Sequence, residues 1–396
     1  MKDVYDYLHM QDEDVDSLPR VDLSESEKQD VLDYIRMKDR GPAAAPGPSA
    51  HRKGRRSGKA FAVLLAASLA VCGTVYAAVR WNRGLEQGMQ IAHSQQEKLE
   101  TENYAQTVGK SCTDAGITVT ADQCIVDNYF AYLSFTVKGY TLPDGAQPDF
   151  ENTDISVDGA DGCAGGGGFY DGTVKASDET VMYADGTPAE TNADGTLISH
   201  YVQEDGSMQY TWTVSAGIDK GALIGKPIHV SLQNLGSYRE KAEFIRDIEG
   251  TWTFDFTLPG SSSAKEVKIN AAMGDTGATV KRAEISPVSL YVVMDYPRQE
   301  EMTEFFEDEN GETEKFTQWK KAPALCGVRY KDGTLLPFIT EAGNMDYTDE
   351  QGTEYAQRRA LDRVIDVGQV DALLFNKNTY QSGLPTEDDF YVVPIG

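Results

Sequence analysis

Histidine and cysteine are the side chains that most often bind transition metals, and the sequence contains five of each. The histidines are His9, His51, His93, His200 and His229. None stands at ligand spacing from a cysteine or another histidine, so the sequence does not support a transition-metal site. His229 alternates with Ile228 and Val230, which predicts an ordinary surface histidine on the outward face of a strand.

Disulfide chemistry is the second possibility that the cysteines raise. Cys72 lies in an apolar run, and Cys112, Cys124, Cys163 and Cys326 follow it. The four cysteines after this run are an even number, and they can form disulfides where that part of the chain lies outside the cell. Cys112 and Cys124 flank a strand-like run at 117–121, and extended chain rises about 3.3 Å per residue, far beyond the reach of a bridge. The sequence therefore argues against that bond and leaves open both a Cys163–Cys326 bond and four free thiols.

A Gly- and Asp-rich run at 158–168 has the composition of a phosphate loop or a calcium loop. No Gly-Lys-Ser or Gly-Lys-Thr closes it, and it lacks the carboxylate spacing and terminal Glu of an EF-hand. We expect a mobile loop between strands, with a weak cation site as the alternative. The chain also lacks the Gly-x-Ser-x-Gly and His-Glu-x-x-His motifs. We therefore predict neither an enzyme nor a cofactor.

The formal net charge of -27 limits the choice of partners. Lys and Arg number 11 against 12 Asp and Glu up to Lys59, and 25 against 51 beyond it. A strongly acidic surface repels phosphate groups, which disfavours direct binding of nucleic acid. The same surface favours cations or basic partners, or serves only to keep the chain soluble.

One apolar run has the length of a membrane span. Residues 60–79 carry no charge, and 20 helical residues at about 1.5 Å each cross about 30 Å of hydrocarbon. Five basic residues precede the run and two follow it, Arg80 and Arg83. The preceding ones are Arg52, Lys53, Arg55, Arg56 and Lys59. The positive-inside rule therefore predicts a single-pass protein of the cell membrane with a cytoplasmic N-terminus and an extracellular C-terminal region.

A cleaved signal peptide and a buried soluble helix are the alternatives for this run. The region before it is nearly sixty residues long, far longer than the charged start of a signal peptide, and the basic flank is not typical of a buried helix. We therefore expect an uncleaved anchor.

The cytoplasmic segment, residues 1–40, is predicted to contain short helices. Ser24 and Glu27 form a capping box, and Val31, Leu32 and Ile35 share one helical face. Such a small segment cannot bury a core of its own. The apolar stripe therefore either docks on a partner, or the helix that carries it stays half-formed in solution. Residues 41–59 are a linker, rich in Pro, Gly and Ala and then basic.

Beyond the span, the polar residues 80–107 predict a stalk helix. Apolar and polar residues then alternate with period two in many short runs, most clearly in residues 252–258. We expect a mainly β fold with two β-sandwich lobes of the immunoglobulin-like kind, at 108–263 and 264–396. A short helix is predicted near Glu354 to Leu361.

The whole arrangement resembles the domain-of-unknown-function 4179 family, anti-sigma-factor-like single-pass membrane proteins of Gram-positive bacteria. The resemblance rests on the acidic N-terminal segment, the basic-flanked span, the hairpin from Gly116-Ile117-Thr118-Val119 to Tyr132-Leu133-Ser134-Phe135-Thr136-Val137, the strand Gly250-Thr251-Trp252-Thr253-Phe254-Asp255-Phe256, and Ile285-Ser286-Pro287. The insertion at about 142–207 departs from the family pattern. The resemblance implies that the cytoplasmic segment sequesters an extracytoplasmic-function sigma factor and that the outer lobes sense an unknown envelope ligand.

Three functions are compatible with the sequence. The first is a membrane-anchored anti-sigma-like regulator in which Val31, Leu32 and Ile35 bind the partner. Because the N-terminal segment lacks the His and paired Cys of a zinc-type anti-sigma domain, that contact would need no metal. The second is a surface binding or structural module without a signalling role, and the third is an envelope enzyme. The sequence does not identify the signal, the partner or the oligomeric state.

Overall fold

The computed structural model describes residues 81–396 except 161–162, 177–178, 194, 217–219, 240–242, 308–312 and 380–382, and it gives only the backbone of 302–307 and 313–318. The predicted cytoplasmic segment, linker and membrane span lie outside the described residues. Within the described part, no helix is both long enough and apolar enough to cross a membrane. The described part is mainly β, as the alternating sequence pattern predicts.

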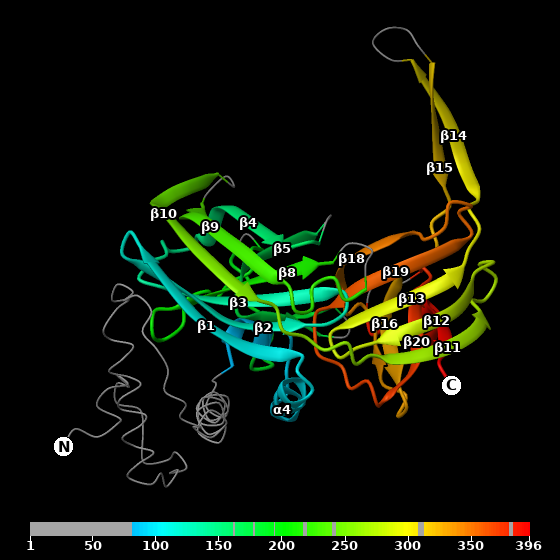
Figure 1. The fold of residues 1–396 in the computed structure, drawn as a ribbon, viewed down its shortest axis with the longest axis horizontal. Helices are drawn as coiled ribbons and strands as arrows, with labels where there is room; N and C mark the ends of the chain where they lie inside the picture. The colour runs from blue at the N-terminus through cyan, green and yellow to red at the C-terminus, as the bar shows by residue number, and fades with distance from the viewer. Residues whose placement is uncertain are drawn as a thin grey trace, which may run out of the picture. The chain divides into compact units, whose positions relative to one another are not determined.

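The first lobe is built from two antiparallel sheets that share one core (Figure 1). One sheet has the order β1 (Ala105–Asp114), β2 (Ile117–Val126), β3 (Phe130–Lys138), β8 (Met208–Ser215) and β5 (Ala164–Phe169). The other has the order β10 (Phe244–Thr257), β9 (Pro227–Tyr238) and β4 (Gln147–Val157). A small hairpin, β6 (Thr173–Lys175) and β7 (Val181–Tyr183), lies in the insertion that precedes β8.

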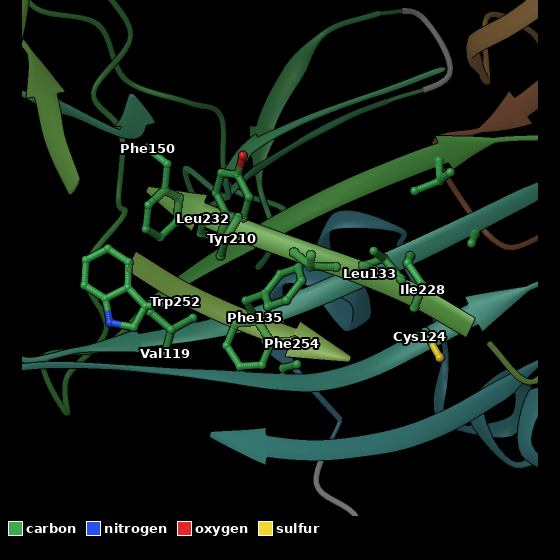
Figure 2. Packing of buried hydrophobic residues seen from close by; sticks show 14 of the residues in the cluster. Val119, Cys124, Leu133, Phe135, Phe150, Tyr210, Ile228, Leu232, Trp252 and Phe254 are labelled. Carbon is green, nitrogen blue, oxygen red and sulfur yellow. The ribbon is translucent and has the colours of Figure 1, made fainter. Parts of the chain in front are cut away.

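Aromatic side chains join the two sheets of the first lobe. Figure 2 shows Phe135 of β3 beside Phe254 of β10, and their ring centroids are 5.6 Å apart. Phe150 of β4 lies 5.7 Å from the ring of Trp252. The Trp252 indole N–H donates to the carbonyl of Ile117 at 3.1 Å. Because large rings bury the most apolar area per residue, these contacts contribute much of the stability of this core.

The second lobe repeats the two-sheet plan with other strands (Figure 1). One sheet has the order β11 (Lys265–Ala272), β12 (Thr279–Ile285), β13 (Ser289–Asp295), β19 (Glu354–Leu361) and β18 (Thr340–Tyr347). The other has the order β17 (Leu335–Leu336), β16 (Leu325–Tyr330), β20 (Val370–Asn376) and β21 (Phe390–Pro394), with the short 3-10 helix η4 (Glu387–Asp389) before β21. β14 (Glu300–Glu307) and β15 (Thr313–Trp319) form a separate two-stranded hairpin that projects from this lobe.

The structure corrects two local predictions. Of the loop predicted at 158–168, the four consecutive glycines at 165–168 instead lie in β5, which pairs with β8. A Cβ atom on Gly165 or Gly167 would collide with Trp212 or its backbone neighbours, so glycine is required there for close packing rather than for loop mobility. The helix predicted at 354–361 is β19, because pairing with β13 and β18 overrides the helix preference of its Ala, Gln, Arg and Leu residues.

Cys112, Cys124 and Cys326 lie in the strands β1, β2 and β16. Cys112 lies opposite Val119, and Cys124 lies opposite Gln106, so the two are far apart in the register of β1 and β2. Cys112, Cys124 and Cys326 are free thiols, which confirms the argument against a Cys112–Cys124 bond and shows that Cys326 forms no bridge with Cys163. Burial raises the pKa of the Cys124 thiol to about 12.

Candidate functional site

The residues that the sequence nominates for partner binding and membrane orientation all lie outside the described residues. They are Val31, Leu32, Ile35, Arg52, Lys53, Arg55, Arg56 and Lys59, and they stay predictions. In the described part of the chain, no group of three or more His, Cys, Asp and Glu side chains is placed to hold a metal ion. Several buried polar side chains lie instead around the segment that enters the lobes and at the contact between the lobes.

The entry segment, residues 81–104, is not the stalk helix that the sequence predicts. It consists of two short helices, α3 (Arg83–Gly88) and α4 (His93–Thr101), which lie against the strands rather than apart from them. Leu85 is 2% exposed and Leu99 is 1% exposed. The apolar residues of this segment are too sparse for a coiled coil, but they suffice to bury one side of it on the lobes.

The entry segment packs on both lobes. Its apolar side chains share one buried cluster with Phe130 and Tyr132 of β3 and with Val288 and Val364 of the second lobe. The backbone N–H of Val364 donates to the carbonyl of Met89 at 3.0 Å, and the side-chain amide of Gln95 donates to the carbonyl of Val364 at 3.0 Å. A movement between the lobes would therefore disturb the segment that follows the predicted membrane span.

A polar network fixes the start of the entry segment on the first lobe. The side-chain amide nitrogen of Asn82 lies 2.6 Å from a carboxylate oxygen of Asp122 and within hydrogen-bond distance of Gln209. Its backbone N–H donates to the side-chain oxygen of Gln123 at 2.6 Å. The Thr136 hydroxyl donates to the same Asp122 oxygen at 2.7 Å. Since buried polar groups are costly unless they are paired, this network holds Asn82 in one position.

Asp122 makes the network sensitive to pH. Burial raises the pKa of Asp122 to about 6, although the hydrogen bonds from Thr136 and Asn82 oppose this. The folded chain therefore binds a proton more tightly than the unfolded chain, so protonation stabilises the fold as the pH falls from 7 toward 5. We expect a gain of about 1 kcal/mol at pH 5 that Asp122→Asn removes. Urea unfolding of the wild type and of Asp122→Asn at pH 7 and pH 5 measures this gain in stability. The same pH dependence in both proteins would contradict a raised pKa of Asp122.

A buried carboxylate joins the two lobes. Asp127, in the turn between β2 and β3, is 1% exposed. One of its oxygens accepts the backbone N–H groups of Tyr129 and Phe130, both at 2.9 Å. The other accepts the hydroxyl of Ser286 at 2.5 Å and that of Ser289, both in the second lobe. Asp127 thus satisfies donors from both lobes at one point, and we call this contact the interlobe latch.

Two tyrosines extend the contact between the lobes. The Tyr132 hydroxyl donates to the carbonyl of Val288 at 2.6 Å and accepts the backbone N–H of Leu361 at 3.0 Å. The Tyr129 hydroxyl donates to a carboxylate oxygen of Glu284 at 3.1 Å, and Lys220 lies 2.9 Å from the same oxygen. Desolvation by burial raises the pKa of the Tyr132 hydroxyl well above its ordinary value, so this group stays a hydrogen-bond donor.

The contact of Asp127 with Ser286 and Ser289 could not be predicted from the sequence. The Asp127-Asn128 pair reads as a turn, and Ser286-Pro287 reads as part of a family pattern. Their contact joins residues 159 positions apart, and no local period encodes such a distance. The local sequence shows an Asp directly after an apolar strand end, and two serines in the turn between two other strands. It does not show that these residues meet.

His229 lies where the sequence predicts. It is on the outward face of β9, between the carboxylates of Asp158 and Asp255. The hydrogen bond with Asp255 is the main reason that the pKa of His229 lies above its ordinary value. The side chain is 50% exposed, which agrees with a surface histidine.

One family model matches part of the chain. Residues 50–139 match the model of a domain of unknown function, DUF4179, the family that the sequence resembles. The solved structure titled "The crystal structure of the conserved domain protein from Bacillus anthracis" is similar to the chain with a TM-score of 0.38 and 12% identity, over 73% of this chain and 85% of that chain. No curated protein matches.

Proposed function

We propose that this chain is a membrane-anchored anti-sigma-like regulator. Its cytoplasmic segment docks an extracytoplasmic-function sigma factor through Val31, Leu32 and Ile35, one helix crosses the membrane at 60–79, and the two β lobes sense the cell envelope. The match of residues 50–139 to the DUF4179 model and the asymmetry of basic residues around 60–79 support this reading.

The main support for this proposal is that the entry segment is buried against both lobes. A module that serves only as a surface anchor needs no more than a loose tether after its membrane span. Here the segment is packed against both lobes and hydrogen-bonded to each, through Asn82 to the first and through Met89 and Gln95 to the second. Such a connection can pass a change in the lobes to the anchor.

The double variant Leu32→Asp with Ile35→Asp tests the docking of the partner. Each apolar side chain contributes about 1.5 to 3 kcal/mol when it is fully buried, so the loss of two should release the sigma factor. We expect the sigma factor to disappear from pull-downs of the tagged full chain and its regulon to be switched on. Ser26→Asp with Gln29→Asp adds the same charges at polar positions and should change neither readout.

The result also separates the two main functions. If the same partners co-purify with the Leu32→Asp and Ile35→Asp variant, and if transcript levels do not change, the surface-module function becomes the better explanation. The linker at 41–59 keeps these substitutions apart from the membrane span.

The predicted topology has a direct test at Leu384. This side chain is 79% exposed, whereas Cys326 is buried and would label poorly from either side. We expect a membrane-impermeant maleimide to label Leu384→Cys in intact cells above the level of the wild type. Labelling that needs permeabilised cells would place the lobes in the cytoplasm and overturn the topology.

A further inference from the structure

The three-stranded sheet of the first lobe has one face on the core and one face turned outward. Its strands β10, β9 and β4 pair with one another in that order. Leu232 of β9 and both Trp252 and Phe254 of β10 lie in the core (Figure 2). Because successive side chains of a strand point to opposite faces, the residues between these three belong to the outward face.

Two neighbouring rows of polar side chains form the middle of the outward face. The members of each row lie opposite one another in the register of β4, β9 and β10. They are Asn152, Gln233 and Thr251 in one row, and Asp154, Ser231 and Thr253 in the next. The members from β4 and β10 are exposed, and those from β9 are half-buried. Amides and hydroxyls both donate and accept hydrogen bonds, and Asp154 is the one charged member. These rows therefore match a ligand that is rich in hydroxyl groups.

Two aromatic rings lie on the same face beyond these rows. Tyr238 of β9 lies opposite Phe244 of β10, and their ring centroids are 5.4 Å apart with 65° between the planes. Ser237 is fully buried, so its neighbour Tyr238 points outward, and Tyr238 is 37% exposed. A Cβ atom on Gly236 would lie 2.8 Å from the Phe244 ring, so glycine is required for the ring to approach β9 this closely. We call the two rings the aromatic corner.

The length and the charges of the outward face narrow the choice of ligand. From His229 to Tyr238 the face extends about 30 Å, at about 3.3 Å per residue of strand. At one end of it His229 contacts Asp255, and toward the other Arg246 lies 2.6 Å from Glu151. Because these charged groups already have partners, they favour neither a strongly anionic nor a strongly cationic polymer. A long, linear and uncharged ligand fits the face best.

We propose that the outward face of β4, β9 and β10 binds an extended, uncharged polysaccharide with β linkages. One sugar ring places its apolar side against the aromatic corner, and the hydroxyls of the following rings exchange hydrogen bonds with the two polar rows. The β linkages keep the chain straight enough to follow the strands. Envelope glycans of N-acetylated sugars and plain glucans share this chemistry. The use of the glycan as a signal rests on the proposed function, whereas the binding itself does not.

Isothermal titration calorimetry of the full chain in nanodiscs of uncharged lipid tests the proposal. The probes are cellohexaose and the β-1,4-linked hexamer of N-acetylglucosamine. We expect saturable binding of at least one of them, and the tighter of the two shows whether the N-acetyl groups contribute. Maltohexaose has the same sugars as cellohexaose, but its α linkages curve the chain. It should bind at least about tenfold more weakly than the tighter probe, because it cannot follow straight strands.

Two variants locate the binding. Tyr238→Ala should raise the Kd of the tighter probe about tenfold, because it removes half of the aromatic corner. Gln233→Ala should raise it at least about threefold, because it removes an amide from a polar row. Ile245→Ala is the matched control. Ile245 is also 37% exposed, but it lies opposite Ser237 on the other face of the same hairpin, so the Kd should stay unchanged.

An absence of binding of both β-linked hexasaccharides by the wild type would overturn the proposal. So would equal binding of maltohexaose, or wild-type Kd values for both Tyr238→Ala and Gln233→Ala. The two substitutions lie in different parts of β9, so a loss of folding in one, seen by urea unfolding, leaves the other as the test. The Leu32→Asp and Ile35→Asp variant should bind the glycan as the wild type does. Failure of the glycan site and failure of sigma-factor docking are therefore distinguishable.

Discussion

Asp127→Ala is expected to lower the free energy of unfolding by about 3 to 5 kcal/mol. The substitution removes the acceptor for the backbone N–H groups of Tyr129 and Phe130 and for the hydroxyls of Ser286 and Ser289. All four donors would then be buried without this partner. Because two come from each lobe, the loss should also weaken the contact between the lobes.

Urea unfolding of the detergent-solubilised full chain, followed by tryptophan fluorescence, measures this effect. We expect a lower midpoint and a broader or divided transition, since the lobes would unfold less cooperatively. Asp144→Ala removes an exposed carboxylate from the first lobe and is the matched control. A midpoint for Asp127→Ala within error of that control would show that the interlobe latch contributes little.

Leu85→Asp should detach the entry segment from the lobes. Leu85 is 2% exposed, so the substitution removes an apolar contact worth about 1.5 to 3 kcal/mol and buries a charge without a partner. Releasing the segment into water avoids that cost, while the aromatic core of the first lobe around Trp252 is left intact. We expect the segment, rather than the lobes, to lose its structure.

Hydrogen exchange of the full chain tests this expectation. The amides of 81–104 should lose protection by at least about a hundredfold, as a loss of about 3 kcal/mol predicts. Those of β9 and β10 should keep theirs. Ser94→Asp places the same charge at an exposed position of α4 and should change neither set. A uniform loss of protection throughout the chain would mean that Leu85 supports the whole fold rather than the attachment of this segment.

The strands of both lobes could be predicted because their signal is local. In β10, the run from Trp252 to Thr257 alternates between the core and solvent, and the sequence shows that period directly. The hairpin of β16 and β17 follows from its Asp332-Gly333 turn, where the Asp332 carboxylate accepts the backbone N–H of Thr334 at 2.9 Å.

The errors arise where the deciding contact is distant. The Gly-rich run became a strand because Trp212, more than forty positions later, packs against it. β19 has helix-forming residues, yet its place between β13 and β18 determines its conformation. The apolar residues of the entry segment do not predict a core by themselves, because the rest of that core comes from first-lobe residues such as Phe130 and Tyr132 and from residues 288–364. The periodicity of a sequence indicates local secondary structure, and it does not indicate contacts between residues that are far apart along the chain.

The attachment of the entry segment also sets an order of events during synthesis. The hydrogen bond from Gln95 to the carbonyl of Val364 spans 269 positions, so a segment made early waits for one made late. Loop closure over such a distance is slow compared with the pairing of neighbouring strands. A chain whose translation or export stopped before Val364 would have a complete first lobe, with the entry segment fixed to it through Asn82 but without its hydrogen bonds to the second lobe. The contact of this segment with the second lobe therefore forms only after residue 364 has been made and delivered.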